Sequence, residues 1–180
     1  MTTRLGNSGD FHSVIPMMRQ RRHRREQHDP NFFRLRPDAD ECFRRWIGEL
    51  AGDPRSMMVV AEEDGRIVGF LLASVDKAPP IYMHNEFGMV HEWWIDPDFQ
   101  ERGAGEALID RATVELAKYG VRQIRICTPE PDGDARQSFE RLGFRSVVRE
   151  MVLELPNRRR RRKRQGLPGS QNIKDPKTPI

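Results

Sequence analysis

The order of apolar and polar positions along the 180 residues predicts helices first, and then strands mixed with helices. Thr2–Leu5 fits a short strand. A helix is expected to begin between Asp10 and Ser13, because either residue can cap a helix N-terminus. A second helix opens near Pro37. The apolar residues of these helices are Val14, Ile15, Met17 and Met18 in the first, and Ala39, Phe43, Trp46, Ile47 and Leu50 in the second.

Two strands joined by a tight turn come next. Met57–Glu62 and Arg66–Ser74 are rich in apolar and β-branched residues, and the Asp64-Gly65 pair between them is typical of a hairpin turn. After a loop over residues 76–87, Met89–Ile95 is a third apolar run of strand length. The first two runs predict an antiparallel hairpin.

The last part of the chain alternates between helix and strand. Its predicted elements are a helix over Gly103–Tyr119 ended by Gly120, a strand over Val121–Thr128, a short helix capped by Asp132 or Asp134 and closing at Gly143, and a final strand or hairpin over Phe144–Leu155. The whole order predicts a three-layer α/β domain built on a mixed sheet.

The connection that leads into the longer of these helices carries the clearest chemical pattern. Residues 97–105 read Pro-Asp-Phe-Gln-Glu-Arg-Gly-Ala-Gly. Glycines at 103 and 105 let the backbone approach a ligand, and the first free N–H groups of a helix point at an anion. The pattern therefore predicts a phosphate-binding loop.

Three phosphate-binding patterns can be compared with this loop. A dinucleotide-binding turn requires a third glycine at the position of Leu108, whose side chain is too large. A nucleotide P-loop requires Gly-Lys-Ser or Gly-Lys-Thr, which the chain lacks. Gln-x-x-Gly-x-Gly preceded by Pro-x-Phe resembles the pyrophosphate loop of the GNAT acetyltransferases. An ordinary strand-to-helix connection is the remaining alternative.

Four segments resemble this family in the expected order. Val59–Phe70 is similar to its second and third strands, Glu92–Pro97 to its fourth strand, Gln100–Gly105 to its pyrophosphate loop, and Ala135–Phe144 to the helix that ends in Leu-Gly-Phe. The resemblance implies a GNAT-like three-layer α/β/α domain. Its central sheet would be mixed, mostly antiparallel, and splayed between strands 4 and 5.

The resemblance also implies how acetyl-CoA binds as a co-substrate. The pantetheine arm lies between the splayed strands, and the pyrophosphate lies on the amides of the loop. Arg102 would contact a phosphate oxygen, with a solvated loop arginine as the alternative. The residues expected to hold the cofactor are Trp93, Trp94, Ile95, Gln100, Glu101, Arg102, Gly103, Ala104, Gly105, Glu106, Asp132, Ala135, Phe139 and Arg141.

Acetyl transfer to an amine needs a base, because a free amine is protonated near neutral pH. Glu92 is the predicted base, since family members often carry a glutamate at this place in the fourth strand; an outward-facing strand glutamate is the alternative. His91 is a second candidate, and strict alternation places it on the opposite face of the sheet. Phe139 stands where many family members have a proton-donating tyrosine, so water or a weaker donor would protonate the leaving thiolate.

The expected function is direct transfer of an acetyl group from acetyl-CoA to a primary amine of a small molecule or a protein. The alternative, which Phe139 motivates, is a coenzyme A-binding regulatory or adaptor module with weak or no catalysis whose basic tail docks on nucleic acid. Residues 1–155 have a formal charge of about −4, which leans toward a cationic acceptor. The resemblance is compatible with a homodimer.

Basic residues gather in two places. The Arg19–Arg25 run is interpreted as the solvated end of the first helix. Residues 156–180 carry nine Lys and Arg and one Asp, and the Arg158–Arg164 run predicts a disordered tail after a domain at residues 1–155. The tail would bind nucleic acid or an anionic lipid surface weakly, or be a solvated segment without a partner.

Cysteines and hydropathy bound the remaining possibilities. Cys42 and Cys127 show neither metal-ligand nor disulfide-framework spacing, which favours two reduced thiols and no metal site. No apolar run approaches the roughly 18 residues of a membrane span, so a cytoplasmic location is expected.

Overall fold

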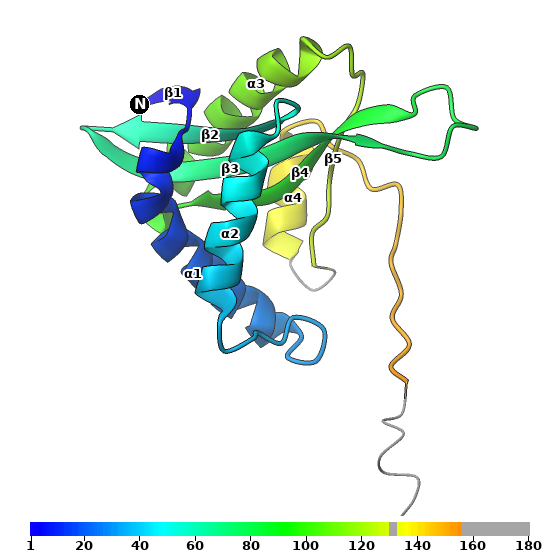
Figure 1. Cartoon of the computed structure of the whole chain (residues 1–180), viewed down its shortest axis with the longest axis horizontal. Helices are drawn as coiled ribbons and strands as arrows, with labels where there is room; N and C mark the ends of the chain where they lie inside the picture. Colours follow the sequence, from blue (N-terminus) through cyan, green and yellow to red (C-terminus); the bar gives the residue numbers. More distant parts are fainter. Residues whose placement is uncertain (130–132, 156–180) are drawn as a thin grey trace, which may run out of the picture. The chain divides into compact units, whose positions relative to one another are not determined.

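The computed structural model describes residues 1–129 and 133–155. Its centre is a five-stranded sheet in the order β1-β2-β3-β4-β5, shown in Figure 1. The strands are β1 (Thr2–Leu5), β2 (Ser56–Glu63), β3 (Arg66–Lys77), β4 (Glu86–Ile95) and β5 (Ile124–Ile126). The first four pair antiparallel and β5 pairs with β4 in parallel, which confirms the predicted mixed, mostly antiparallel sheet.

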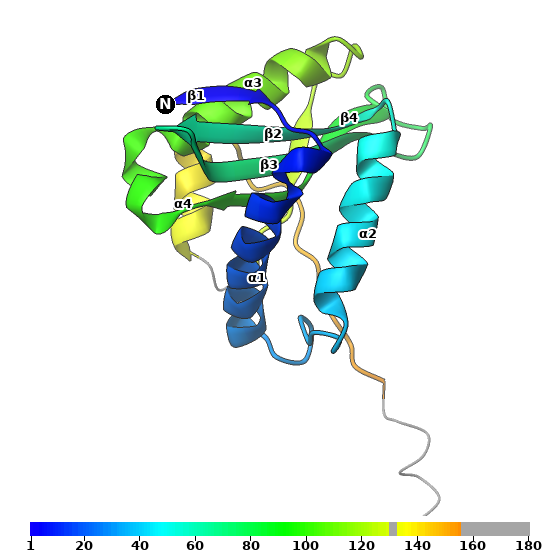
Figure 2. The same ribbon diagram turned by 60° about the vertical axis from the view of Figure 1, so that its left-hand side comes forward.

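Helices cover both faces of this sheet. They are the 3-10 helices η1 (Ser8–Asp10) and η2 (Pro97–Arg102) and the α-helices α1 (Phe11–His28), α2 (Ala39–Gly52), α3 (Ala104–Ala117) and α4 (Gly133–Arg141). Figures 1 and 2 show α1 and α2 on one face of the sheet, called here the α1 face, and α3 and α4 on the other, the α3 face. The predicted three layers are confirmed.

Strand alternation divides the core between these two faces. On the α1 face, Ile47 of α2 belongs to one buried cluster with Phe70 of β3. On the α3 face, Leu108 of α3 belongs to a second cluster with Leu71 of β3. Each side chain of this kind contributes about 1.5–3 kcal/mol to folding when it is fully buried. The two clusters together hold both helix layers against the sheet.

The β2–β3 hairpin turns where the sequence predicts. Asp64 and Gly65 both have positive φ angles, 50° and 75°. A two-residue turn with both central residues in this region matches the right-handed twist of the strands that it joins. The turn thus joins β2 and β3, and the register of their ladder shifts once, between Ala61 and Glu62.

An irregularity in the β3–β4 ladder changes which way β4 side chains point. Leu72 pairs with Glu92 and Ala73 with Val90, so His91 is an extra residue in β4. A bulge of this kind interrupts the strict alternation of side chains. The prediction that His91 and Glu92 lie on opposite faces is therefore wrong, and both lie on the α1 face.

The parallel pair β4–β5 is short. It joins only Gly88 with Ile124, Met89 with Arg125 and Val90 with Ile126. Within the described residues β5 ends there, whereas β4 continues to Ile95. The strand predicted over Val121–Thr128 is thus limited to three residues, and the outer edge of β4 beyond Val90 has no β5 partner. This is the predicted splay of strands 4 and 5.

The predicted final strand or hairpin over Phe144–Leu155 is wrong. These residues have no regular secondary structure, and Val148 and Leu153 are each 86% exposed. Alternation alone does not make a strand, because the backbone groups also need a neighbouring strand to pair with. Met1–Arg145 forms one compact unit and Ser146–Ile180 a second. The predicted boundary at residue 155 stays a prediction, and the Arg158–Arg164 run lies outside the described residues.

Candidate active site

The loop after β4 turns at Gly103. η2 ends there, and α3 begins with Ala104. Gly103 has a φ of 78°, which costs an L-residue roughly 1–2 kcal/mol. A Cβ added to Gly103 would meet no atom within 4 Å, so conformation, and not space inside the protein, explains this glycine.

Gly105 has a different role. A Cβ at this position would lie 3.1 Å from both Ile95 Cδ1 and Trp93 Cζ2, closer than ordinary van der Waals contact. The glycine therefore allows the first turn of α3 to pack directly on β4. The sequence interpretation was that both glycines clear space for a pyrophosphate. At Gly105 the structure does not support it, because the position that a Cβ would occupy faces Ile95 and Trp93 of the protein.

The first turn of α3 can accept an anion. Among the described residues, none of the turn, loop and side-chain hydrogen bonds has the amide of Gly103, Ala104, Gly105 or Glu106 as donor. The helix dipole adds partial positive charge at the same place. These free amides fit a diphosphate group. Glu101 and Glu106 are exposed beside them, and the Arg102 guanidinium lies over the Phe99 ring at 5.0 Å.

Gln100 ties this loop to β4. Its side-chain amide donates a hydrogen bond to the Ile95 carbonyl oxygen, with 3.3 Å between Nε2 and O. Ile95 itself lies on the α3 face, packed against the apolar cluster there. The described residues thus connect the strand that would hold a pantetheine arm with the loop that would hold its pyrophosphate.

The aromatic residues predicted to line the cofactor site separate between the two faces. Trp93 lies on the α3 face, 5.0 Å edge-on from Phe139 of α4, and Phe139 in turn contacts Phe144. Trp94 lies on the α1 face, where the Arg24 guanidinium stacks on it at 4.9 Å. Phe139 therefore serves packing in this structure.

The other predicted cofactor residues belong to α4 or its start. Ala135 is half-buried on α4. Arg141 is exposed, and its guanidinium donates to Ser138 Oγ at 3.4 Å. Asp132 lies outside the described residues.

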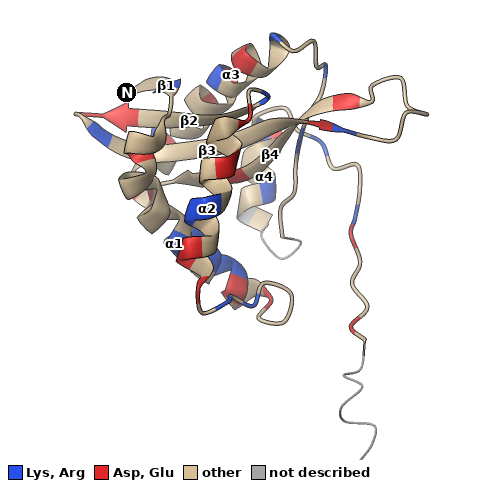
Figure 3. Ribbon diagram, viewed as in Figure 1, with Lys and Arg blue, Asp and Glu red and all other residues tan. Residues whose placement is uncertain are grey.

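The Glu92 carboxylate is held by two arginines of α1. Arg21 Nε donates to Oε2 at 2.6 Å, and Arg25 Nη1 donates to Oε1 at 3.2 Å. Glu92 is only 8% exposed. Figure 3 shows this basic half of α1 in blue. The interpretation of the Arg19–Arg25 run as a solvated helix end is wrong for these two residues.

Sequence reasoning missed this clamp, the contacts of Arg21 and Arg25 with Glu92, although the spacing of the two arginines indicated it. Arg21 and Arg25 are four positions apart, so they share one face of a helix. That face of α1 turns toward the sheet, because Val14 and Met18 at the same spacing are buried. A basic pair in line with buried apolar residues indicates a buried acidic partner.

His91 takes part in a chain of hydrogen bonds on the same face. Its Nε2 lies 2.6 Å from Ser74 Oγ, and Ser74 Oγ donates to Asp76 Oδ1 at 2.5 Å. The imidazole ring also contacts the Trp46 indole of α2 edge-on, with 5.7 Å between centroids. Only the bulge in β4 brings His91 within reach of Ser74.

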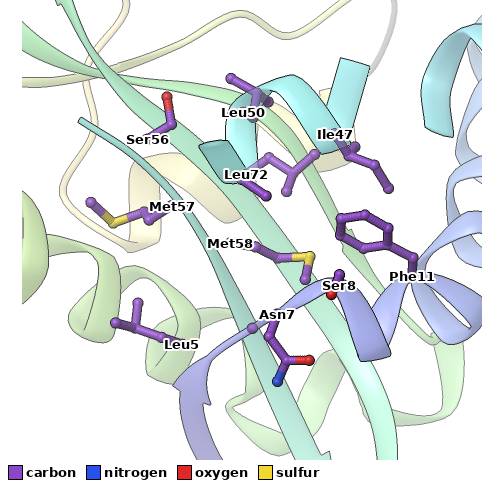
Figure 4. A pocket seen from close by; sticks show the side chains of 12 residues that line it. Leu5, Asn7, Ser8, Phe11, Ile47, Leu50, Ser56, Met57, Met58 and Leu72 are labelled. Atoms are coloured by element: carbon purple, nitrogen blue, oxygen red, sulfur yellow. The ribbon is translucent and has the colours of Figure 1, made fainter. Parts of the chain in front are cut away.

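Two hollows lie away from this part of β4. Figure 4 shows one of about 330 Å³, lined mainly by apolar side chains such as Phe11, Ile47 and Met58. The other lies between α1 and α2 and includes Arg22 and Asp40, which form an ion pair.

In the described part of the chain no group of His, Cys, Asp and Glu is arranged to hold a metal ion. No helix there is long and apolar enough to cross a membrane.

Comparisons with known proteins identify the family of the chain. Over 126 residues the chain is 30% identical to a mycothiol acetyltransferase of Propionibacterium freudenreichii subsp. shermanii, covering 68% of this chain and 38% of that protein. It is 34% identical to an uncharacterised N-acetyltransferase of Methanocaldococcus jannaschii over 85 residues, 47% of this chain and 37% of that protein. The chain thus spans less than two fifths of the length of these relatives.

A solved structure shares the fold. The crystal structure of a predicted acetyltransferase from Clostridium acetobutylicum with acetyl-CoA superposes with a TM-score of 0.68 at 17% identity, covering 85% of this chain and 95% of that one. Residues 19–144 match the sequence profile of the acetyltransferase (GNAT) family. That match includes β4, the glycine loop and α4, and the chain belongs to the acetyltransferase (GNAT) family.

Proposed function

We propose that the protein transfers an acetyl group from acetyl-CoA directly to a primary amine of a small molecule or a protein. The observation that supports this most is the combination of free amides at the start of α3 with the unpaired edge of β4. The amides suit a diphosphate, and the strand edge offers backbone groups to an extended thiol-bearing arm. Family membership supplies the reaction class.

A side chain on the α1 face of β4 is proposed to take the amine proton. Glu92 is the predicted base and His91 the alternative, and the two are neighbours where β5 leaves β4. A base at this place is suited to an amine that approaches from the α1 face. Phe139 has no proton to donate, so the thiolate is proposed to receive its proton from water.

The acceptor is proposed only as a primary amine. The overall acidic balance of residues 1–155 leaned toward a cationic acceptor, but the local charge does not add support. Two arginines face the single carboxylate of Glu92, so this part of the α1 face has no spare negative charge for a polycation. A homodimer and a weak anionic partner for Arg158–Arg164 stay predictions.

The cofactor half of the proposal is tested by calorimetric titration with acetyl-CoA, using a matched pair of variants. Gly103 and Gly120 have nearly equal φ angles, 78° and 76°, and an added Cβ would meet nothing within 4 Å at either. Gly103→Ala and Gly120→Ala therefore carry the same backbone strain. We expect Gly103→Ala to weaken binding about tenfold and Gly120→Ala to leave affinity unchanged.

The acetyl-transfer half is tested by thiol release across polyamines, aminoglycosides, amino acids and peptides. Turnover with at least one amine is expected. Tight acetyl-CoA binding without thiol release from any amine would contradict the enzyme and favour the alternative, a cofactor-binding module. An equal loss of affinity in both glycine variants would contradict the placement of the pyrophosphate.

A further inference from the structure

We propose that His91 is the general base, that Ser74 and Asp76 position it, and that Glu92 is a positioning residue. This inference rests on the proposed acetyl transfer and chooses between its two candidate bases. It starts from the bulge in β4, which turns His91 and Glu92 to the same face at the point where β5 ends. Their different partners there separate their roles.

The hydrogen bonds assign the protons of the His91 ring. Ser74 has one hydroxyl proton and donates it to the Asp76 carboxylate, which can only accept. Ser74 Oγ must therefore accept from His91, so Nε2 carries a proton. In a neutral imidazole this leaves a lone pair on Nδ1. No described residue bonds Nδ1, and the side chain is partly exposed.

Glu92 has the opposite surroundings. Both of its oxygens accept hydrogen bonds from arginines, and the side chain is almost fully buried. Each arginine side chain is itself only partly exposed, 18% for Arg21 and 20% for Arg25, so the two charge-assisted contacts are formed mostly away from water. A substrate amine would have to displace a guanidinium to reach either oxygen, and the two ion pairs hold α1 against β4.

The proposed step moves one proton and one acetyl group. As the amine nitrogen forms its bond to the thioester carbonyl carbon, His91 Nδ1 takes the proton from that nitrogen. The carbon–sulfur bond breaks and the sulfur leaves with the electron pair. The imidazolium returns its proton to the sulfur through solvent. Asp76 stabilises the imidazolium through Ser74, so its charge favours the proton transfer.

Charged groups around His91 determine the expected pH dependence. Asp76 faces the ring through Ser74 from β3, and Glu92 with Arg21 and Arg25 lies beside it. The described contact from α2 is the uncharged Trp46 ring. We expect kcat/KM to fall at acidic pH, because a protonated imidazole cannot act as a base.

Kinetics of four variants test the assignment with an accepted amine. His91→Gln should lower kcat about 100-fold, abolish the acid limb of the pH profile, and leave acetyl-CoA affinity unchanged. Asp76→Asn should lower kcat less and move the acid limb to lower pH, because the imidazolium loses a stabilising charge. Glu92→Gln should keep the wild-type acid limb. His84→Gln, in an exposed loop, is the matched control and should change nothing.

Nuclear magnetic resonance of the ring nitrogens gives a readout that does not depend on turnover. At pH 8 the His91 signal should show a proton on Nε2 and a lone pair on Nδ1, and Ser74→Ala should relax this preference. A proton on Nδ1 would overturn the proposal. So would loss of the acid limb in Glu92→Gln with full activity of His91→Gln. Thiol release by the wild-type protein tests the proposed function by itself, separately from the comparisons of the variants with the wild type.

Discussion

The two faces of β4 are built by opposite means. On the α3 face, Trp93 and Ile95 pack against Gly105 without any charged group between them. On the α1 face, Glu92 is held by two arginines, and His91 by Ser74, which in turn donates a hydrogen bond to Asp76. An apolar face fixes the position of a loop through close packing, whereas a face of ionised groups supplies proton acceptors and donors.

This difference separates two functions, positioning of the loop on the α3 face and the proposed proton transfer on the α1 face. On the α3 face the described contacts of Trp93 and Ile95 are apolar, and their role is to present the first turn of α3 at a fixed distance from the strand. The α1 face costs more to assemble, because its charges lose water on burial. Mutations on the α1 face should therefore affect chemistry and pH dependence as well as stability, and those on the α3 face stability and cofactor binding.

The largest expected effect is on the α1 face. Glu92→Ala removes the nearly buried carboxylate that binds the partly buried Arg21 and Arg25, and should lower the free energy of unfolding by about 3–5 kcal/mol. Arg19→Ala is the control, since it breaks an exposed pair with Asp40 and should cost below about 1 kcal/mol. Urea unfolding measures both. Similar losses in the two variants would remove the distinction between this clamp and a surface ion pair.

On the α3 face, Leu108→Ala should lower the free energy of unfolding by about 3 kcal/mol. Leu108 is 0% exposed and belongs to the apolar cluster behind the sheet, so the change leaves a cavity. The loss should be the same at pH 5 and pH 8, because the cluster around it is apolar. Thermal or urea unfolding at the two pH values measures it. A pH-dependent loss would contradict the contrast between the faces.

A smaller effect is expected at Gly105. Gly105→Ala places a Cβ 3.1 Å from Ile95 Cδ1 and Trp93 Cζ2, and overpacking of this kind costs about 1–3 kcal/mol. The shift of α3 away from β4 should also weaken acetyl-CoA binding, measured by calorimetry. Gly48→Ala, at a helix position where the new Cβ meets nothing within 4 Å, should stabilise slightly. Unchanged affinity in Gly105→Ala would show that the loop tolerates movement.

The smallest effect concerns pH. Arg4 donates two hydrogen bonds to the Asp10 carboxylate and holds the pKa of that group below its usual value. The resulting stabilisation is complete above the unfolded pKa of about 3.9 and is lost as the pH falls through the lower folded value. Asp10→Asn should therefore cost about 1 kcal/mol at pH 7 and less at pH 3. Thermal unfolding at both pH values measures this, and an equal cost would contradict it.

Local patterns predicted much of the fold. Apolar spacing located α2 and β2, the Asp64-Gly65 pair located the hairpin, and Gly103 marked the start of α3. These features depend on neighbours in sequence, so they can be predicted without a structure. The segment Phe144–Leu155 shows the limit, since its alternation depends on a partner strand that no local pattern contains.

The sequence by itself determined the strand, the glycine turn and the helix whose first amides are proposed to bind an anion, because φ preferences and free helix amides are local properties. Tertiary structure decided the chemistry on the α1 face. One extra residue opposite Leu72 and Ala73 turns His91 toward Ser74, and the packing of α1 brings Arg25 to Glu92 across 67 positions. Register shifts and buried ion pairs depend on contacts between distant segments, and the order of residues along one strand cannot reveal them.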